Sequence, residues 1–308
     1  MELRYINNET LEYMIKSKEH WIRKDYEDYL NGKTIKPMPQ KIGFSNYKIG
    51  IVIPNHNYGE WIEKCLNSIR NQIYQNYEVI FVDDMSTDNS VEIAKEYQRT
   101  GMPIKIIELK QRRLNGGARN EGYLHLSGDV DYVWYVDSDD WLSDSDVLGK
   151  INAHLVGKPD VLFVGLGADY NGIMRSYYTP NYRDKYEAML GWSGSSGKVI
   201  KKELATKQEC LYQEGTLKED RTQHYKICIE MQSFRCLNEI VYVWNKNNTK
   251  STSTERNKKW KADTIRNWAD SIDVFNTYKG TDIKLDQILQ QRVDNCKNEV
   301  MINEDSQQ

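Results

Sequence analysis

Short apolar segments alternate with amphipathic segments between residues 48 and 142, and this alternation restricts the chain to few folds. Strands are expected at 48–53, 77–82, 104–109 and 132–136, because these runs are short and rich in β-branched and aromatic residues. Between them, apolar residues recur every three or four positions, as they do on one face of a helix. Short connections of this kind require parallel strands with helical crossovers. The sequence therefore predicts an α/β fold with a mostly parallel sheet.

Polar side chains follow three of these strands at the point where each strand ends. Residues 55–57 (Asn-His-Asn) follow the first strand, residues 83–84 (Asp-Asp) the second, and residues 137–140 (Asp-Ser-Asp-Asp) the fourth. In parallel α/β sheets, ligands bind beyond the carboxyl ends of the strands. Because all three clusters should meet at that edge, the sequence predicts a ligand site there.

The composition argues against several classes of protein. The chain of 308 residues has 42 Lys and Arg against 45 Asp and Glu, and this net charge of −3 argues against a nucleic-acid partner held by bulk charge. Its five cysteines are dispersed and never spaced Cys-x-x-Cys, so neither a disulfide framework nor a cysteine zinc site is expected. No apolar run reaches the roughly 18–20 residues that span a bilayer, and no signal-peptide core is found near the start. We expect a cytoplasmic protein without a transmembrane segment.

The acidic clusters have both a functional and an ordinary interpretation. Asp137 and Asp139 place two hard oxygen groups near one point, which suits Mg²⁺ or Mn²⁺ bound through carboxylates, phosphate oxygens and water. Alone, however, an Asp-x-Asp sequence is more often a solvated turn or a helix cap. The pair at 83–84 is equally ambiguous, since such a carboxylate accepts from a base, from a ribose or from a helix amide. Arg119 follows two glycines at a helix start, which suits a phosphate neighbour.

The order and spacing of four motifs are more informative than any one motif. The motifs are Pro-Asn-His-Asn at 54–57, Val-Asp-Asp-Met-Ser-Thr-Asp at 82–88, Asn-Gly-Gly-Ala-Arg-Asn-Glu-Gly at 115–122 and Val-Asp-Ser-Asp-Asp-Trp-Leu at 136–142. Together they strongly resemble the family 2 glycosyltransferases of the GT-A fold. The resemblance implies a Rossmann-like, mostly parallel sheet with helices on both faces.

The resemblance also implies a division of the chain. A domain at 46–254 would hold a nucleotide-binding half at 46–142 and an acceptor half at 143–254. A helical N-terminal extension at 1–45 and C-terminal helices at 255–308 would flank it, since amphipathic patterns occur in both segments. We expect these terminal helices to mediate homo-oligomerisation.

The activity that the resemblance implies is a metal-dependent, inverting transfer of a hexosyl or N-acetylhexosaminyl group. The donor would be a nucleotide sugar, most often a UDP-sugar, and the acceptor a hydroxyl of a carbohydrate or another polymer. Asp139, with Asp137, would hold Mn²⁺ or Mg²⁺, and Asp220 would be the general base. The residues that would line the donor and acceptor sites are Pro54, Asn57, Asp83, Asp84, Arg119, Asp137, Trp192 and Ser251.

The catalytic assignment leaves alternatives open. A sugar hydroxyl needs a carboxylate within about 3 Å to accept its proton during attack. Glu219 competes with Asp220 for this role, but adjacent helical residues point about 100° apart, so only one faces the sugar. His224 lies one helical turn later and either orients the base or belongs to the core. A sugar-nucleotide pyrophosphorylase and a non-catalytic nucleotide-sugar or carbohydrate-binding domain are the alternative functions.

Overall fold

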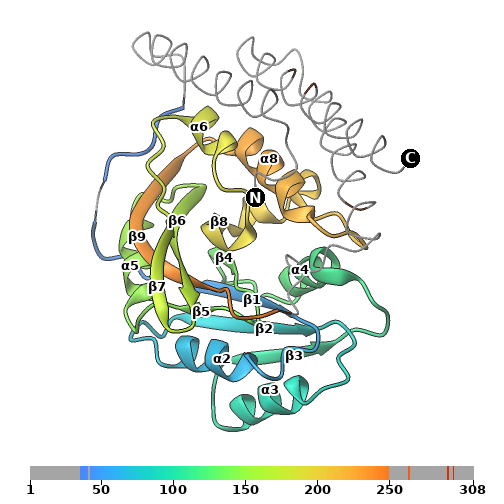
Figure 1. Ribbon diagram of the computed structural model, residues 1–308. Helices are drawn as coiled ribbons and strands as arrows, with labels where there is room; N and C mark the ends of the chain where they lie inside the picture. Colours follow the sequence, from blue (N-terminus) through green and yellow to red (C-terminus); the bar gives the residue numbers. More distant parts are fainter. Residues whose placement is uncertain (1–34, 41, 250–262, 264–289, 291–293, 295–308) are drawn as a thin grey trace.

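The computed structural model describes residues 35–40, 42–249, 263, 290 and 294, and these residues form a curved sheet flanked by helices (Figure 1). The strands are β1 (Ile49–Asn55), β2 (Tyr77–Asp83), β3 (Ile104–Glu108), β4 (Tyr132–Tyr135), β5 (Trp141–Leu142), β6 (Val161–Tyr170), β7 (Ile173–Tyr178), β8 (Lys198–Lys201) and β9 (Phe234–Asn245). The helices are α2 (Ile62–Arg70), α3 (Ser90–Arg99), α4 (Leu114–Leu124), α5 (Val147–His154), α6 (Lys185–Leu190), α7 (Lys202–Ala205) and α8 (Glu219–Glu230), with the short 3-10 helices η2 (Ser195–Gly197) and η3 (Gln208–Cys210).

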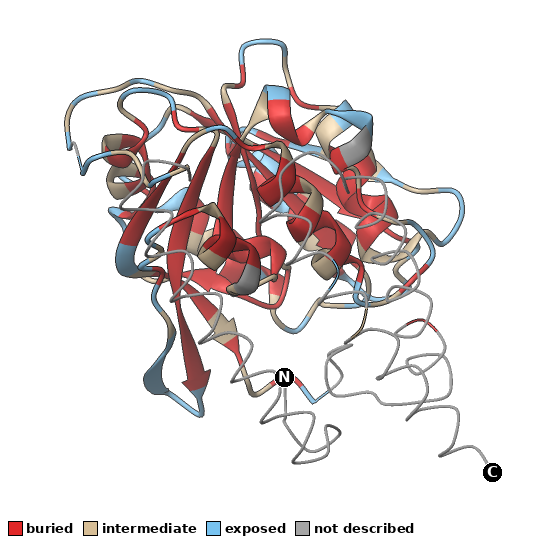
Figure 2. Cartoon of the chain, turned by 90° about the horizontal axis from the view of Figure 1, so that it is seen from above, coloured by how far each residue is buried: buried red, intermediate tan, exposed pale blue. Residues whose placement is uncertain are grey.

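The first half of the sheet is parallel, as the alternating pattern predicts. Strand β1 pairs in parallel with β2 on one side and with β4 on the other, and β2 pairs in parallel with β3. Every residue of β1 is buried, which is usual for a strand covered on both faces. Figure 2 accordingly colours most strands of the sheet as buried along most of their length, whereas β7 is largely exposed.

Side chains of successive β1 residues enter two different hydrophobic cores. Val52 packs with residues of α4, α6 and α8, whereas Ile51 and Ile53 pack with residues of α2, α3 and α5. This alternation follows from the two-residue period of a strand. Figure 1 shows α2 and α3 on one side of the sheet and α4, α6 and α8 on the other. The prediction of a mostly parallel sheet with helices on both faces is confirmed.

The second half of the sheet is mixed. Strand β8 runs antiparallel to β4 and to β6, and β9 is parallel to β6. Among the described residues, the strand order of the nine-stranded sheet is β3-β2-β1-β4-β8-β6-β9-β5. Strand β7 pairs with the C-terminal part of β6. Because β8 runs antiparallel to β4, β8 begins at the edge of the sheet where β4 ends. The chain just before β8 therefore lies at that edge.

The described part of the N-terminal segment is extended rather than helical. The Met38 amide donates to the Phe234 carbonyl at 2.7 Å, and Gln40 donates through its side chain to the Cys236 carbonyl at 2.8 Å. Residues 35–40 therefore run along the first residues of β9. The helices expected at 1–45 and 255–308 fall almost wholly outside the described residues, so this division stays a prediction. No helix within the described residues is long and apolar enough to cross a membrane.

Candidate active site

The three polar clusters lie together at one edge of the sheet. Asn55 at the end of β1 pairs in register with Asp83 at the end of β2. Strand β4 lies on the other side of β1 and leads directly into residues 137–140. The carboxyl ends of neighbouring parallel strands thus bring the acidic clusters to one edge, as the sequence indicates.

Asp83 is engaged in holding the loop that follows β2. Its carboxylate accepts from Asn55 Nδ2 at 2.9 Å and from the Ser86 amide at 2.9 Å. Asn55 Nδ2 also lies 2.8 Å from Ser90 Oγ at the start of α3. Asp83 is buried, so it orients the loop rather than presenting a free carboxylate at the surface.

Asp84 connects the end of β2 to the segment before α4. Its carboxylate accepts from Arg112 Nη1 at 2.6 Å and from the Arg113 amide at 2.7 Å. The His56 ring contacts the Asp84 carbonyl through Nδ1 at 2.8 Å. The Asp84 side chain is almost fully buried, whereas that of Arg112 is 39% exposed. Arg112 thus adds a cation to the predicted nucleotide side of the site.

Pro54 and Asn57 shape the turn after β1. Pro54 is buried within the strand, in register with Val82 of β2. Asn57 has a φ of 60°, a left-handed conformation that Asn tolerates better than most residues. Its side-chain oxygen accepts from the Thr87 amide at 2.8 Å, which joins the loops that follow β1 and β2.

Arg119 connects the two halves of the site. Its Nη2 lies 2.6 Å from Asp137 Oδ1, and its Nη1 lies 2.5 Å from Glu219 Oε1. The guanidinium is 4% exposed and lies over the Tyr212 ring, 5.2 Å from its centroid. One arginine on α4 therefore joins the loop after β4 to the first turn of α8. Its sequence context suits a phosphate neighbour, but in the structure both ends of the guanidinium contact carboxylates.

Glu219 and Asp220 have different surroundings although they are neighbours. Glu219 is buried against Arg119, whereas Asp220 is half-buried at the next position of the helix. Burial raises the pKa of Glu219 to about 7; Arg119 acts in the opposite direction, and the Asp220 charge adds to the increase. Glu219 is thus fixed by its ion pair with Arg119. Of the two neighbouring carboxylates, Asp220 retains more solvent access.

Asp139 is a buried carboxylate with one side-chain donor. Asn248 Nδ2 donates to its Oδ2 at 2.8 Å. Burial, with the neighbouring Asp137 charge, raises the pKa of Asp139 to about 6, although the Asn248 hydrogen bond lowers it. A carboxylate in this position gains from a cation, which would relieve both effects.

Asp140 fixes the loop to β9. Tyr242 Oη donates to its Oδ2 at 2.5 Å, and the Asn245 amide donates to its Oδ1 at 2.8 Å. The same Tyr242 hydroxyl accepts from the Asp137 amide at 3.2 Å. Burial raises the pKa of Asp140 well above its ordinary value, and the nearby carboxylates add to the increase. Through these contacts, β9 helps to set the position of the loop that carries Asp137 and Asp139.

The donor set fits a hard divalent cation. Asp137 and Asp139 supply carboxylate oxygens two residues apart, and the pKa of Asp139 is raised first by burial and then by the Asp137 charge, both of which a bound cation would offset. Within the described residues, no three His, Cys, Asp or Glu side chains form a metal-binding group. Mg²⁺ is usually bound by one or two carboxylates with substrate phosphates and water, so this pair suffices in principle.

Of the remaining predicted residues, Trp192 and His224 lie in the second half of the sheet region and Ser251 lies outside the described residues. Trp192 is half-buried, with its ring centroid 5.2 Å from that of Tyr177 and 5.8 Å from that of Trp244. His224 is fully buried, and its Nε2 lies 3.1 Å from the Ala188 carbonyl of α6. His224 therefore belongs to the core between α8 and α6.

Three groups at the site have no strong local sequence signal. Asn248 and Tyr242 contact the acidic loop from more than one hundred positions away in the chain. The pKa of Tyr58 is raised by burial and by the charges of the three aspartates at 137, 139 and 140. Tyr58 follows the polar motif after β1 directly, and that adjacency is the signal that could have identified it.

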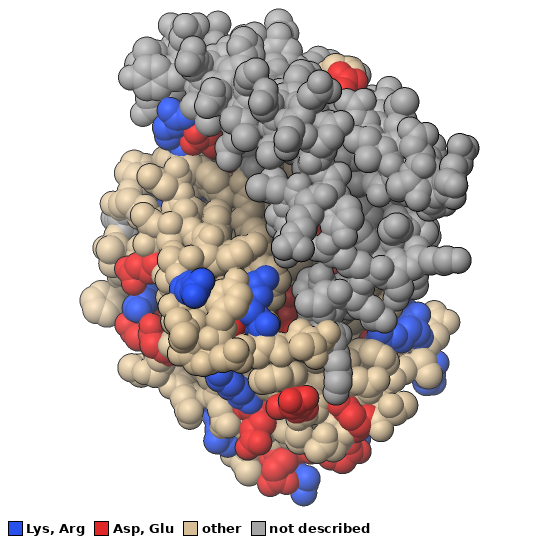
Figure 3. All heavy atoms as spheres, viewed as in Figure 1, with Lys and Arg blue, Asp and Glu red and all other residues tan. Residues whose placement is uncertain are grey.

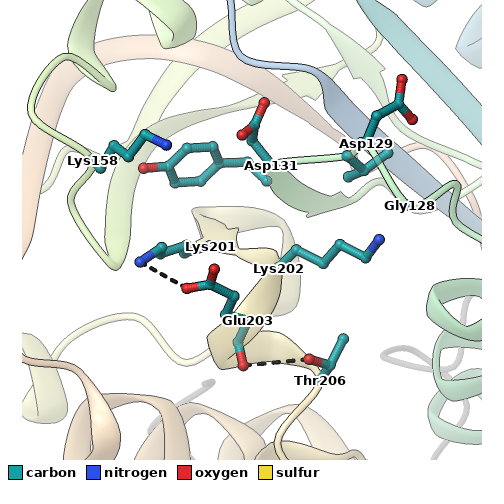
Figure 4. Close-up of a pocket in the computed structure, with 10 residues that line it drawn as sticks. Gly128, Asp129, Asp131, Lys158, Lys201, Lys202, Glu203 and Thr206 are labelled. Carbon is teal, nitrogen blue, oxygen red and sulfur yellow. Dashed lines mark hydrogen bonds and ion pairs between the residues drawn. The ribbon is translucent and has the colours of Figure 1, made fainter.

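A cavity of about 360 Å³ lies at the opposite edge of the sheet (Figure 4). It is lined at the start of β4 and the end of β8, where the Lys201 and Glu203 side chains form an ion pair at 2.9 Å. Lys202 Nζ donates to the Ser127 carbonyl at 2.6 Å. Lys201, Lys202 and Glu203 thus have partners within the protein. The cavity is separate from the acidic edge of the sheet.

Surface charge over the described residues is mixed. On the face shown in Figure 3, Lys and Arg side chains lie among Asp and Glu side chains. This distribution agrees with the net charge of −3 and differs from the basic footprint typical of a nucleic-acid-binding protein.

Comparison with known proteins gives a family match. Residues 50–221 match the family described as Glycosyl transferase family 2. Glycosyltransferase GlyA of Streptococcus pneumoniae is 35% identical over 139 residues, which are 45% of this chain and 19% of that protein. Poly(ribitol-phosphate) beta-glucosyltransferase of Bacillus spizizenii is 33% identical over 138 residues, 42% of this chain and 21% of that protein. The match thus spans about a fifth of the length of these two curated relatives.

Solved structures share the fold. TarS 1–349 of S. aureus, in complex with UDP-GlcNAc, superposes with a TM-score of 0.65 at 19% identity, covering 80% of this chain and 72% of that one. The mannosyltransferase PcManGT of Pyrobaculum calidifontis, in complex with GDP-Man and Mn²⁺, gives a TM-score of 0.58 at 16% identity, covering 96% and 80%. The GT-A type of fold expected from the sequence is confirmed.

Proposed function

Since the chain belongs to glycosyl transferase family 2, we propose that it transfers a sugar from a UDP-sugar to a hydroxyl of a carbohydrate or polymer acceptor, with inversion at the anomeric carbon. The family match covers more than half of the chain and includes every predicted site residue except Ser251. It also argues against a sugar-nucleotide pyrophosphorylase. The proposal assigns the nucleotide to residues 46–142 and the acceptor to residues 143–254.

The contact of Arg119 with both Asp137 and Glu219 carries this proposal. It joins the loop that holds Asp139 to the helix that holds Asp220, through bonds of 2.6 Å and 2.5 Å. An inverting transfer needs a base on one side of the anomeric carbon and a stabilised leaving group on the other. The bridge supports a single site in which these two groups act on one substrate.

Asp220 is the proposed general base. The acceptor hydroxyl is a weak nucleophile, and it needs a carboxylate within about 3 Å to accept its proton. Glu219 is engaged by Arg119 and buried, whereas the neighbouring Asp220 is half-buried. We assign to Glu219 the role of positioning Arg119, and to Asp220 the removal of the proton.

Asp139 and Asp137 are the proposed metal-holding residues. Mn²⁺ or Mg²⁺ would neutralise the charge that develops on the departing diphosphate, so no proton donor is needed there. Asn248 and the Tyr242–Asp140 contact hold the two carboxylates in place. Asp84, Arg112 and the turn at Asn57 form the proposed nucleotide side.

The donor and acceptor classes draw on relatives. Similar structures were solved in complex with UDP-GlcNAc, UDP or GDP-Man, so a hexosyl or N-acetylhexosaminyl donor is proposed. One relative is named for glucosylating a poly(ribitol phosphate) polymer. A polyol or glycan polymer is therefore the acceptor class to test first.

The test is a panel of UDP- and GDP-sugars incubated with Mn²⁺, scored by release of the nucleoside diphosphate. Asp220→Asn should abolish turnover and leave UDP binding within about twofold of wild type, since Asp220 acts on the acceptor. Asp146→Asn removes an exposed carboxylate in the loop before α5 and serves as a control that keeps full activity. Normal turnover by Asp220→Asn would refute the base assignment. Binding of UDP-sugar without any turnover by wild type would instead support the non-catalytic alternative.

A further inference from the structure

Residues 192–197 form a loop that folds around its own tryptophan. A Cβ at Gly194 would lie 2.5 Å from Trp192 Nε1, and a Cβ at Gly197 would lie 2.7 Å from Trp192 Cδ1. Real Cβ atoms do not approach that closely, so the indole packs directly on the glycine backbone. The position of Trp192 therefore depends on the conformation of this loop.

Lys198, the residue that follows the loop, is a fully buried lysine at the start of β8. Its Nζ donates to the Ser193 carbonyl at 2.9 Å and to the Gly194 carbonyl at 2.7 Å. Lysine is rarely buried, because an ammonium group removed from water needs strong partners. Here both carbonyl partners belong to the loop and lie directly after Trp192.

Two other contacts fix the loop. Trp134 Nε1 donates to the Ser196 carbonyl at 2.8 Å, and the Trp192 amide donates to Tyr182 Oη at 3.2 Å. Both of these are neutral hydrogen bonds. The Lys198 bonds are charge-assisted, and such bonds are roughly twice as strong as neutral ones. Lys198 is therefore the strongest of these attachments of the loop.

Titratable groups of α8 and α4 act on Lys198. Burial lowers the pKa of Lys198 to about 8; Cys228 and Asp220 of α8 oppose this decrease, and Arg119 of α4 adds to it. Asp220 and Arg119 belong to the candidate active site, whereas Cys228 is a buried core residue.

We propose that Lys198 is a positioning residue, whose buried ammonium group holds the loop at 192–197 and, through it, the Trp192 indole against Tyr177 and Trp244. Its role in transfer rests on the proposed function, because it acts through the acceptor side of that site. The role of Lys198 in holding the loop does not depend on the proposed function. Removal of the ammonium takes a donor from the Ser193 and Gly194 carbonyls, and Gly194 keeps the weaker bond from the Gly197 amide at 3.3 Å, so the loop should loosen.

Hydrogen exchange measures the loop directly. In Lys198→Met, amides of residues 193–197 should exchange about tenfold faster than in wild type, while those of β1 and β2 keep their rates. Lys201→Met is the matched control, because Lys201 ends the same strand and its Nζ pairs with Glu203. Unchanged exchange of the loop in Lys198→Met would overturn the proposal. If Lys198→Met does not fold, Lys198→Gln, which keeps N–H donors without the charge, should give an intermediate rate.

A pH series separates the ammonium from simple packing. In wild type, protection of the loop, corrected for the intrinsic exchange rate, should fall by about threefold or more between about pH 7 and about pH 9, as the amine loses its charge. Lys198→Met should lose this dependence. The groups facing the amine are Asp220, Cys228 and Arg119. A loop with the same pH response in wild type and Lys198→Met would contradict the assignment.

Binding and turnover distinguish failure of this proposal from failure of the proposed function. UDP affinity of Lys198→Met should stay within about twofold of wild type, because the nucleotide side lies at β1 and β2. In the acceptor assay, kcat/KM should fall about tenfold or more through the acceptor KM. If wild type turns over no nucleotide sugar, the proposed function fails, and the exchange result still decides the role of Lys198. If kcat/KM is unchanged while the loop loosens, Lys198 is structural only and the proposal is overturned.

Discussion

Arg119 and Glu219, one hundred positions apart in the chain, form a buried ion pair in which Nη1 lies 2.5 Å from Oε1. The same guanidinium contacts Asp137 on its other side. The guanidinium of α4 is thus shared by Asp137, in the loop after β4, and Glu219, at the start of α8. This ion pair makes the position of Asp220 depend on the loop that carries Asp139.

Arg119→Met should strongly destabilise the fold. It leaves the Asp137 and Glu219 carboxylates near each other without their cation, and breaking a buried pair costs about 3–5 kcal/mol. Urea unfolding at pH 8 measures this loss. At pH 5 the loss should be smaller, because the pKa of Glu219 is raised to about 7 and its carboxylate is then mostly protonated. Arg99→Met, which breaks an exposed pair with Glu96, should change stability by about 1 kcal/mol or less; equal losses in both variants would contradict the prediction.

Glu219→Gln should remove part of the pH dependence of stability. Burial raises the pKa of Glu219 from its ordinary value of 4.5 to about 7 in the folded protein. The native state therefore binds more protons than the unfolded state between these two pH values. Stability conferred by the protonated form is therefore present below 4.5 and lost as the pH rises to about 7. Denaturant midpoints across this range should fall less steeply in Glu219→Gln, by on the order of 2 kcal/mol in total. Parallel curves for the two proteins would show that Glu219 is ionised normally.

Asn248→Ala should weaken metal binding. It removes the side-chain donor to Asp139 Oδ2, and groups that orient a metal ligand typically affect affinity by about 10–100-fold. Titration calorimetry with Mn²⁺ in the presence of UDP gives the affinity. Asn247→Ala, which instead removes a donor to Asp169, is the control and should bind Mn²⁺ as wild type does. Equal Mn²⁺ affinity in both variants would remove Asn248 from the metal site.

Tyr242→Phe should lower both stability and metal affinity. It leaves Asp140 Oδ2 and the Asp137 amide without their shared partner, at a cost of about 1–3 kcal/mol. Tyr132→Phe removes a comparable buried hydroxyl bond, to the Pro159 carbonyl, at the other end of the sheet. Both variants should lose stability, but only Tyr242→Phe should also lose Mn²⁺ affinity. Wild-type affinity in Tyr242→Phe would show that its hydroxyl serves packing alone.

The sequence predicts the first half of the fold because its signals are local. The apolar face of α2, formed by Ile62, Cys65, Leu66 and Ile69, can be identified from its spacing, and all four side chains are buried. The place of Asp139 at a strand end follows from the same local pattern. The position of β8 between β4 and β6 cannot be predicted in this way, because it depends on pairing between strands far apart in the chain.

The site is predictable in its residue types but less so in its connections. Arg119 was expected beside a phosphate, since two glycines at a helix start suit a phosphate. Its partner Glu219 lies on a helix whose position is fixed by tertiary packing, and no local pattern indicates the ion pair. Asn248 and Tyr242 carry no motif of their own. Their roles arise only when β9 is placed beside the acidic loop.

Strand β9 joins two parts of the protein that are distant in sequence. Its first residues bind the segment 35–40, and Tyr242 and Asn245 near its end hold Asp140. The strand is 12 residues long and is paired with β6 over most of that length. One strand therefore holds the segment 35–40 at its start and Asp140 near its end, so a shift of its register against β6 would disturb both contacts together.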